Sequence, residues 1–424
     1  MGSPLTFGAL ADDFTGAVEL AAMLRAAGAR AMVHVGPGSL PDRPPEVDAI
    51  VVALRTRAAP AGEAVAISRQ VAQQLRRLGA RQLFLKYCAT FDSLPAGNIG
   101  NVAEVLREVA GAAPVLFCPT YPEAARTVFR GHMFVGGQLL ADSPKRHDPL
   151  TPMTNSNLAE VLALQTSLAV DILPYEVVAA GAAAIHTHAE ACHAAGRPFL
   201  IADSILPEDL RQIAAASCDW PVMTGGASVA AYFPSLWVAR GWMRPSEQPS
   251  LPGTPGPAAV LAGSCADRTR EQVAAFARDH KVLDLDPLDP PEQSIARALS
   301  WASEHMAHAP VCITTSADPA RVAAAQAALG SIAAGRRAEA LLARIASGLV
   351  ERGVRRLLVA GGETSGAIVE QLGVRSLQVA PFAAIGVGRC HADHPVPLAL
   401  CLKSGKLGAV DMFATTLAAM EQPA

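Results

Sequence analysis

The sequence predicts an α/β protein of two domains, each a mainly parallel β-sheet flanked by helices. With 424 residues, 51% of them apolar, the chain exceeds the size that a single hydrophobic core usually reaches. Short apolar runs alternate with longer segments of helical period, which is typical of a parallel sheet covered by helices on both faces. A stretch dense in proline and glycine interrupts this alternation past the middle of the chain and predicts a domain boundary there.

The first domain is expected to cover residues 1–243. Its first helices are predicted at about Thr15 to Ala27, across residues 64–78, where apolar side chains share one face, and from about Gly97 onward. Seven apolar runs predict its strands, at 4–10, 30–35, 48–54, 81–87, 113–119, 198–203 and 219–225.

The second domain is expected at residues 258–424, because the alternation of strands and helices restarts there. The stretch before it, "RPSEQPSLPGTPGP" at 244–257, has the composition of an extended linker. Five apolar runs predict the main strands of this domain, at 258–264, 281–285, 310–315, 355–360 and 397–403.

Charge and composition exclude several kinds of partner. The formal net charge is −3 with no basic block, which argues against nucleic acid. No apolar run is long enough and free enough of glycine and charge to span a bilayer, and the N-terminus lacks a secretory pattern. Eight cysteines without C-x-x-C spacing indicate a reducing compartment. We expect a cytoplasmic protein that binds small molecules and neither nucleic acid nor membranes, and a homodimer is one of the assemblies that the sequence allows.

A glycine-rich turn in the second domain has the features of a phosphate site. The strand ending at Ala360 runs into "GGETSG", and a helix is expected directly after Gly366. Glycines let backbone amides approach an anion, and a helix N-terminus adds unpaired N–H groups. The candidate residues are Gly361, Gly362, Glu363, Thr364, Ser365 and Gly366. The alternative is a plain β-to-α turn with Thr364 or Ser365 as the N-cap.

Two further turns strengthen the nucleotide interpretation. Ser264 follows the first strand of the second domain, and Lys403, Ser404 and Gly405 end its last strand. Ligands of open parallel sheets bind outside the carboxyl ends of the strands, so three such turns at one edge suit a nucleoside triphosphate. The chain has neither a Walker A loop nor a dinucleotide fingerprint, and three ordinary turns remain the alternative.

Charged residues follow three strands of the first domain. Asp12 and Asp13 end the first strand, Arg57 follows the third, and Lys86 and Asp92 lie at and beyond the end of the fourth. Adjacent carboxylates repel one another unless they are solvated or have cationic partners, which Arg57 and Lys86 could supply. Arginine and lysine also suit an anionic substrate, while carboxylates suit sugar hydroxyls. The alternative is a set of solvated charges at strand ends.

Two other segments are weaker indicators of a functional site. The polar run at 143–158, broken by three prolines, predicts either a functional flap or a surface connection. The cluster His186, His188, Cys192 and His193 resembles a metal site only superficially, because His186 and His188 face different sides of the expected helix. No metal-ligand residues are therefore predicted.

These motifs, taken together, resemble the four-carbon acid sugar kinases, and in particular their 3-oxo-tetronate branch. The resemblance covers nearly the whole chain, through "ADDFTGA", "KYCATFDSLPAGNIG", "HDPLTPMTNSNL", "GGETSGA" and "LKSG". The threonate and erythronate branches tend to carry a "K-x-D-S-T-x-R-G" type of sequence in place of "KYCATFDS". Two departures stand out. The usual "KSGNFG" ending is "KSGKLG" here, with Lys406 and Leu407, and "LRTR" replaces a Lys-Ser-Arg type of run, so Arg57 rather than Arg55 is carried over.

The resemblance implies an N-terminal sugar-acid-binding domain and a C-terminal ATP-binding domain. It implies phosphorylation of the terminal (C4) hydroxyl of a four-carbon acid sugar, most like 3-oxo-tetronate, with ATP and Mg²⁺. In this interpretation Asp12 or Asp13 deprotonates the hydroxyl, Arg57, Lys86 and Asp92 bind the acid sugar, and the turns of the second domain hold ATP. The alternatives are a D-threonate or D-erythronate kinase, and a non-catalytic sugar-acid sensor with a regulatory nucleotide domain.

Overall fold

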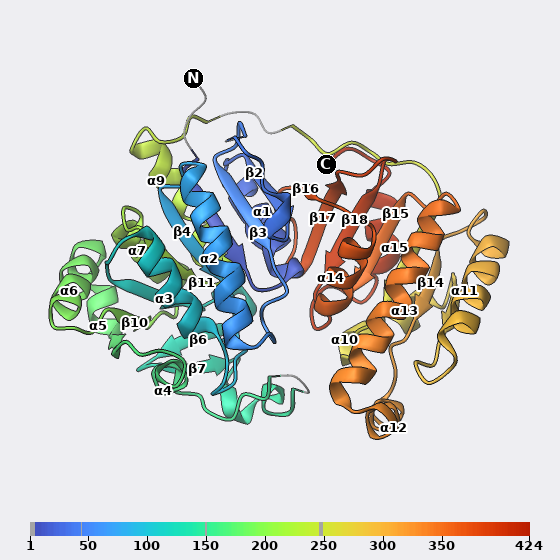
Figure 1. The fold of residues 1–424 in the computed structure, drawn as a ribbon, viewed down its shortest axis with the longest axis horizontal. Helices are drawn as coiled ribbons and strands as arrows, with labels where there is room; N and C mark the ends of the chain where they lie inside the picture. Colours follow the sequence, from blue (N-terminus) through green and yellow to red (C-terminus); the bar gives the residue numbers. More distant parts are fainter. Residues whose placement is uncertain (1–4, 44, 149–150, 246–248) are drawn as a thin grey trace. The chain divides into compact units, whose positions relative to one another are not determined.

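The chain forms two compact α/β units in a computed structural model, residues 1–248 and 249–424 (Figure 1). The structure describes all residues except 1–4, 44, 149–150 and 246–248. Each unit has a largely parallel sheet with helices on both faces, so the predicted fold class is confirmed. The division falls inside the stretch 244–257 that the composition marks as a linker.

The first unit is built on an eight-stranded sheet in the order β2-β3-β1-β4-β11-β5-β10-β9. The neighbouring strands that the register describes run parallel throughout. The strands are β1 (Phe7–Ala11), β2 (Ala31–Val35), β3 (Ala49–Ala53), β4 (Gln82–Lys86), β5 (Val115–Cys118), β9 (Val170–Leu173), β10 (Phe199–Ala202) and β11 (Val222–Gly225). Each of the seven predicted apolar runs of this domain overlaps one of these strands, whereas β9 was not predicted.

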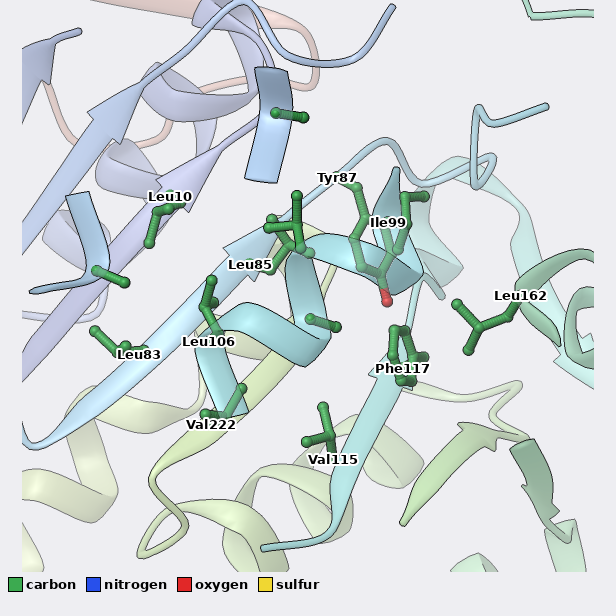
Figure 2. Close-up of a cluster of buried hydrophobic side chains, with 14 of the residues drawn as sticks. Leu10, Leu83, Leu85, Tyr87, Ile99, Leu106, Val115, Phe117, Leu162 and Val222 are labelled. Carbon is green, nitrogen blue, oxygen red and sulfur yellow. The ribbon is translucent and has the colours of Figure 1, made fainter. Parts of the chain in front are cut away.

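Helices cover both faces of this sheet. Because side chains alternate along a strand, Leu10, Leu83 and Leu85 face one side, against α2 and α3, while Phe7 and Phe84 face the other. The helices of the unit are α1 (Phe14–Ala26), α2 (Ala61–Arg77), α3 (Ile99–Ala110), α4 (Leu158–Ala163), α5 (Tyr175–Ala179), α6 (Ala182–Ala194), α7 (Pro207–Ser217), α8 (Ala227–Ala230) and α9 (Phe233–Ala239). Figure 2 shows part of this core, to which Leu10, Leu85, Leu106 and Phe117 contribute side chains.

A small antiparallel sheet interrupts the first unit and was not predicted. It consists of β6 (Arg126–Phe129), β7 (His132–Val135) and β8 (Gln138–Leu139). The carboxylate of Asp203, at the end of β10, accepts hydrogen bonds from the backbone N–H groups of Arg130 and Gly131 in the tight turn between β6 and β7. Both turn residues have positive φ, so this buried carboxylate stabilises a conformation that only Gly131 adopts without strain.

The second unit has seven strands in the order β13-β14-β12-β15-β18-β17-β16. The strands are β12 (Ala258–Ala262), β13 (Lys281–Asp284), β14 (Val311–Thr314), β15 (Arg356–Ala360), β16 (Ser376–Val379), β17 (Val387–Ala392) and β18 (Ala399–Lys403). The helices are α10 (Asp267–Phe276), α11 (Pro291–His305), α12 (Pro319–Leu329), α13 (Ser331–Glu351), α14 (Gly362–Gln371) and α15 (Met412–Ala419). The strands from β13 to β18 in this order run parallel, each to its neighbour. Strand β17 pairs antiparallel with both β18 and β16. None of the helices in the described ranges is both long and apolar enough to cross a membrane.

Both units begin with the same arrangement of four strands, β2-β3-β1-β4 in the first and β13-β14-β12-β15 in the second. In each, the first strand lies between the third and the fourth, and the connections from these strands leave toward opposite edges of the sheet. Such a reversal of strand order is where α/β sheets bind ligands, outside the carboxyl ends of the strands. The fold therefore places a candidate site after β1 and β4 in one unit and after β12 and β15 in the other.

Candidate functional site

The first candidate site lies at the carboxyl edge of the first unit, where the backbone of Asp12 joins three strand ends. Its N–H donates to the carbonyl of Lys86, 3.0 Å away, at the end of β4. Its carbonyl accepts from the N–H groups of Thr56 and Arg57, at 3.1 and 3.2 Å, after β3. These backbone bonds bring together the strand-end residues that the sequence predicts at this edge.

Asp12, Asp13 and Arg57 form one buried charge cluster. The guanidinium of Arg57 makes two hydrogen bonds to the carboxylate of Asp12, Nε to Oδ2 at 2.9 Å and Nη2 to Oδ1 at 2.7 Å. Its Nη1 lies 3.0 Å from Oδ2 of Asp13. Both aspartates are 6% exposed, so neither is a solvated strand-end charge. Arg57 is the cation that lets two adjacent carboxylates stay close in a buried site.

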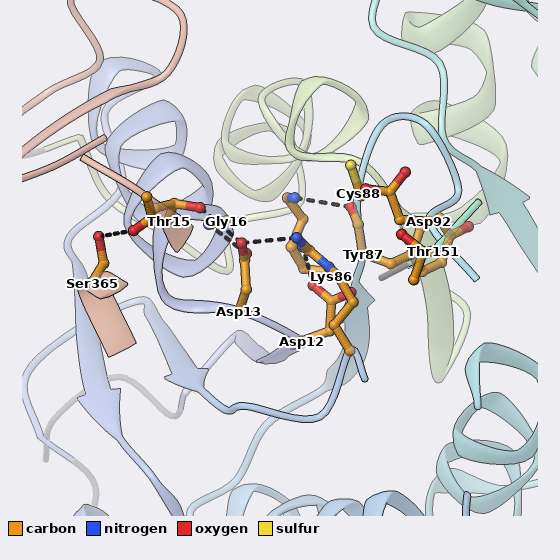
Figure 3. Close-up of polar contacts among 12 residues, drawn as sticks. Asp12, Asp13, Thr15, Gly16, Lys86, Tyr87, Cys88, Asp92, Thr151 and Ser365 are labelled. Carbon is orange, nitrogen blue, oxygen red and sulfur yellow. Dashed lines mark hydrogen bonds and ion pairs between the residues drawn. The ribbon is translucent and has the colours of Figure 1, made fainter. Parts of the chain in front are cut away.

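Asp13 has a second, local function as the N-cap of α1. Its carboxylate accepts from the N–H of Gly16 at 2.7 Å and from the hydroxyl of Thr15 at 2.8 Å (Figure 3). A Cβ at Gly16 would lie 2.5 Å from Oδ1 of Asp13 and 3.0 Å from Nζ of Lys86, so only glycine fits there. The "DDFTG" sequence thus combines helix capping with a crowded cationic site.

The two aspartates have pKa values that move in opposite directions. Burial raises the pKa of Asp12 above its ordinary value, and the attraction of Arg57 only partly offsets it. Burial also acts on Asp13, but the charges of Arg57 and Lys86 and the hydrogen bonds from Thr15 and Gly16 outweigh it and lower its pKa. Opposite shifts in adjacent carboxyl groups separate a proton acceptor from a permanent anion.

Lys86, the last residue of β4, and Asp92, in the segment after it, border the same edge. The ammonium of Lys86, 3% exposed, donates to the carbonyl of Tyr87 at 2.9 Å. Asp92 lies beyond a turn in which Phe91, a buried non-glycine residue, has φ of 50°. Phe91 packs edge-on against Tyr87, which holds this strained backbone in place.

Lys145 is a residue of this site that the sequence analysis missed. Its Nζ lies 2.7 Å from Oδ1 of Asp92 and 3.0 Å from Oδ2 of Asp148, and its side chain is 10% exposed. Thr90 also donates to Asp92, at 2.6 Å. Burial favours the neutral acid, but Lys145 and Arg57 outweigh it and lower the pKa of Asp92. The polar run at 143–158 was the available signal, although nothing in it singles out Lys145.

The second candidate site is formed by three turns of the second unit. A Cβ on Gly263 would lie 2.2 Å from Oγ1 of Thr364, and a Cβ on Gly405 would lie 2.1 Å from Oγ of Ser264. Gly361 has φ of 134°, which side chains rarely adopt, and its Cβ would lie 2.8 Å from Oγ1 of Thr364. The turns after β12, β15 and β18 are therefore packed closely together, with backbone against side-chain hydroxyls.

Helix α14 begins at Gly362 and not after Gly366, so the expected helix start is wrong by five residues. Glu363, Thr364 and Ser365 thus lie in the first turn of the helix, and the N-cap is Gly361. The hydroxyl of Ser365 is buried and donates to the carbonyl of Gly361 at 2.7 Å. Thr364 is the residue of this turn whose hydroxyl is directed at the turn after β12.

Polar side chains of α10 and the segment after β14 support these turns and were not predicted. Thr269 donates to the carbonyl of Gly405 at 2.8 Å, and Ser316 donates to the carbonyl of Ser264 at 2.6 Å. Lys403 is fully buried, and its Nζ contacts the hydroxyl of Thr269 and the carbonyl of Gly405, each at 3.2 Å. Thr269 and Ser316 lie outside any glycine-rich pattern, so the sequence carried no sign of their contacts.

Two family models match the chain, each over one unit. A sugar-binding N-terminal domain matches residues 7–233, and a nucleotide-binding C-terminal domain matches residues 259–413. The fold and its two strand-end sites thus define a two-domain protein of the sugar-binding and nucleotide-binding class.

Curated relatives narrow this class. A 3-oxo-tetronate kinase of Burkholderia multivorans is 43% identical over 98% of this chain and 97% of its own length. A 3-oxo-tetronate kinase of Pseudomonas fluorescens is 42% identical over 97% and 96%. The chain belongs to the 3-oxo-tetronate kinase family.

Solved structures share the fold. A Salmonella typhimurium protein described as a tRNA synthase has a TM-score of 0.84 at 32% identity, over 97% of this chain and 98% of its own. A Haemophilus influenzae protein has a TM-score of 0.74 at 30% identity, over 98% of this chain and 100% of its own.

Proposed function

We propose that the protein transfers the γ-phosphoryl group of ATP to the terminal C4 hydroxyl of 3-oxo-tetronate. The observation that carries the proposal is the full-length similarity to relatives named for that activity. The buried aspartate pair after β1 and the glycine-lined turns after β12, β15 and β18 supply the chemistry that such a reaction needs.

We assign the base to Asp12. A general base must accept a proton near the working pH, and burial raises the pKa of Asp12 while that of Asp13 is lowered. Asp12 takes the proton of the C4 hydroxyl as the oxygen attacks the phosphoryl group. Asp13 stays ionised, holds the start of α1 and keeps Arg57 in place beside Asp12.

Arg57 is engaged by both aspartates, so we assign it the positioning of the base. The ammonium group of Lys86 has three N–H donors, and one of them donates to the carbonyl of Tyr87. Lys86 is therefore the cation proposed to meet the substrate carboxylate. Asp92, oriented by Thr90 and Lys145, is proposed to accept hydrogen bonds from the sugar.

ATP is proposed to bind with its phosphates against Ser264, Gly361 to Thr364 and Ser404 to Gly405. The proposal relies on the close packing of these turns, because a Cβ at Gly361 or Gly405 would collide with Thr364 or Ser264 and displace the backbone proposed to bind phosphate. When bound, Mg²⁺ would neutralise charge on the phosphate oxygens, and such ions usually take only one or two protein carboxylates. Glu363, in the first turn of α14, is the carboxylate proposed to hold it.

The test is an ADP-release assay with the purified protein over a panel of four-carbon acid sugars. We expect the highest kcat/KM with a 3-oxo-tetronate and a product phosphorylated at C4. A clear preference for D-threonate or D-erythronate would replace the proposed substrate. Tight binding of both ligands without turnover of any acid in the panel would favour a sensor.

A further inference from the structure

Lys403, the last residue of β18, is a buried lysine with neutral partners. It is fully buried, and its Nζ contacts the hydroxyl of Thr269 and the carbonyl of Gly405. Among the residues that the structure describes, no carboxylate lies within ion-pair distance of it. A buried ammonium without a counter-charge is costly, and burial accordingly lowers the pKa of Lys403 to about 7.

The elements around Lys403 do not neutralise it. Cys401 on the same strand is an uncharged thiol, because burial raises its pKa to about 12. Arg268 of α10 is cationic and lowers the pKa of Lys403 further. The remaining charged or titratable groups on the elements packed around Lys403 are Arg356 on β15, Glu363 and Glu370 on α14, Arg389, Cys390 and His391 on β17, Asp267, Arg270 and Glu271 on α10, and Lys406 and Asp411 after β18.

The side chain of Lys403 also shapes the turn that follows it. The hydroxyl of Thr269 and the Nζ of Lys403 both donate to the carbonyl of Gly405. A peptide unit is planar with its C=O and N–H opposed, so fixing this carbonyl turns the N–H of Lys406 to the opposite side. Protonation of Lys403 strengthens its hydrogen bond to this carbonyl, because charge-assisted hydrogen bonds are stronger than neutral ones. It therefore stabilises this orientation of the peptide between Gly405 and Lys406.

We propose that Lys403 takes up a proton when nucleotide phosphates bind, and that the resulting ammonium holds the turn at Gly405 in its phosphate-binding conformation. This inference rests on the nucleotide site proposed above. Phosphate supplies the negative charge that the protein itself does not place beside Lys403, so the charged form is favoured only in the complex. Lys403 is thus a positioning residue, and the affinity for nucleotide is linked to pH.

The sign of the linkage follows from the two protonation states. Below about pH 6 the free protein already holds the proton, so binding takes up almost none. At about pH 8 the free protein is mostly neutral at Lys403, so binding takes up close to one proton. Affinity should then weaken as the pH rises above 7, by up to about tenfold per pH unit, until the pKa of the complex is reached.

The experiment is calorimetric titration of the full-length protein with Mg·ADP at about pH 8, in two buffers of different ionisation enthalpy. The dependence of the apparent enthalpy on buffer measures the protons taken up, and we expect about one for the wild type. Lys403→Arg should bind Mg·ADP with almost no uptake, since arginine stays charged, and its affinity should vary little with pH. Lys403→Met should bind at least about tenfold more weakly, again without uptake.

Lys406→Met is the matched control, because Lys406 is exposed and lies only three residues away. It should keep the proton uptake of the wild type. Wild-type binding without proton uptake, or uptake that survives in Lys403→Arg, would overturn the inference. Failure of the wild type to bind Mg·ADP at all would instead overturn the proposed nucleotide site. If Lys403→Met does not fold, the wild type and Lys403→Arg still decide the outcome.

Discussion

At the residue scale, the first site depends on a few buried charges whose environments differ over very short distances. Asp12 and Asp13 are adjacent in sequence and share Arg57, yet only Asp13 also accepts hydrogen bonds from α1. A helix N-terminus and the nearby charge of Lys86 favour its ionised form. Desolvation is the largest effect on the pKa of Asp12, and it raises this pKa. The strand-to-helix junction therefore gives two identical side chains different chemical properties.

The first prediction separates the two aspartates. Asp12→Asn keeps the size of the side chain but cannot accept a proton, so kcat should fall by roughly 10²-fold or more while nucleotide affinity is kept. Asp13→Asn can still cap α1, since asparagine is a good N-cap, and should lose less kcat. Steady-state kinetics at saturating acid sugar and ATP measures the difference.

The double variant is the control for this prediction. If the two residues act as one unit, Asp12→Asn with Asp13→Asn should be little worse than Asp12→Asn alone. Near-normal turnover in both single variants would remove the base from this site. A larger loss in Asp13→Asn than in Asp12→Asn would exchange the two assigned roles.

The second prediction concerns pH and the Asp92–Lys145 pair. The pKa of Asp92 is lowered in the folded protein, so its ionised form contributes stability above its unfolded pKa, and this is lost as the pH falls through the folded pKa. Lys145→Met leaves a buried carboxylate without its main partner. The free energy of unfolding should drop by about 3 kcal/mol at neutral pH.

This loss should shrink in acid, because Asp92 then takes up a proton in the variant and needs no cation. Urea unfolding of wild type and Lys145→Met at pH values from about 4 to 7 measures it. Lys145→Met combined with Asp92→Asn should recover part of the stability at neutral pH. A deficit that is constant across this range would mean that packing, not charge, makes Lys145 important.

The sequence identified some of these residues and not others for a physical reason. Asp12, Asp13 and Lys86 sit at strand ends, which apolar periodicity locates well, and parallel pairing then brings the ends together. Lys145 reaches Asp92 from a short 3₁₀ helix, Pro144–His147, in a separate segment of the chain. No local pattern specifies such a contact, because its partner is fixed by the packing of the whole unit.

At the scale of elements, the turn from β15 to α14 is the most constrained of the second site. The sequence correctly indicated a strand, a glycine turn and a helix, but the helix begins five residues earlier than expected. Glycine is unfavourable in helix interiors, so the sequence pattern predicts a loop at "GGETSG". In the structure Gly362 and Gly366 are helical, and only Gly361 has the backbone conformation that requires glycine.

The third prediction tests this turn. Gly361→Ala places a Cβ 2.8 Å from Oγ1 of Thr364 and forces an alanine to φ of 134°. We expect the KM for ATP to rise by about tenfold or more, with little change in the KM for the acid sugar. The variant should also lose on the order of 1–3 kcal/mol of stability from backbone strain.

Gly373→Ala is the matched control for Gly361→Ala. Gly373 lies just beyond the other end of α14, has φ of 66°, and has no atom within 4 Å of its Cβ position. It should lose about 1 kcal/mol of stability and keep the ATP kinetics of the wild type. Equal ATP kinetics in both variants would mean that the Gly361 turn is structural and holds no phosphate.

At the scale of the whole molecule, composition predicted two α/β units, but not where the second one begins. Residues 244–257 carry few large apolar side chains and resemble a free linker. Yet Leu251 is buried and exchanges two backbone hydrogen bonds with Ala424, and the N–H of Thr254 donates to the carbonyl of Met420. The side chain of Arg356 also donates to the carbonyl of Gly256. Composition does not reveal such pairing, because it uses backbone groups that every residue has.

The fourth prediction follows from this pairing. A fragment of residues 249–424 should fold and bind Mg·ADP, because the turns after β12, β15 and β18 all belong to this unit. A fragment of residues 258–424 lacks the strand-like segment that pairs with the C-terminal tail. Residues 251–257 make five backbone hydrogen bonds to the rest of the unit, including two that the carbonyl of Pro257 accepts from Arg355 and Arg356. At about 1 kcal/mol for each bond lost, the shorter fragment should be less stable by about 5 kcal/mol. Urea unfolding of both fragments measures the difference, and calorimetry measures their affinity. Equal stability would show that residues 249–257 are only a connector, and a folded 249–424 fragment that binds no nucleotide would show that the unit does not carry a complete site.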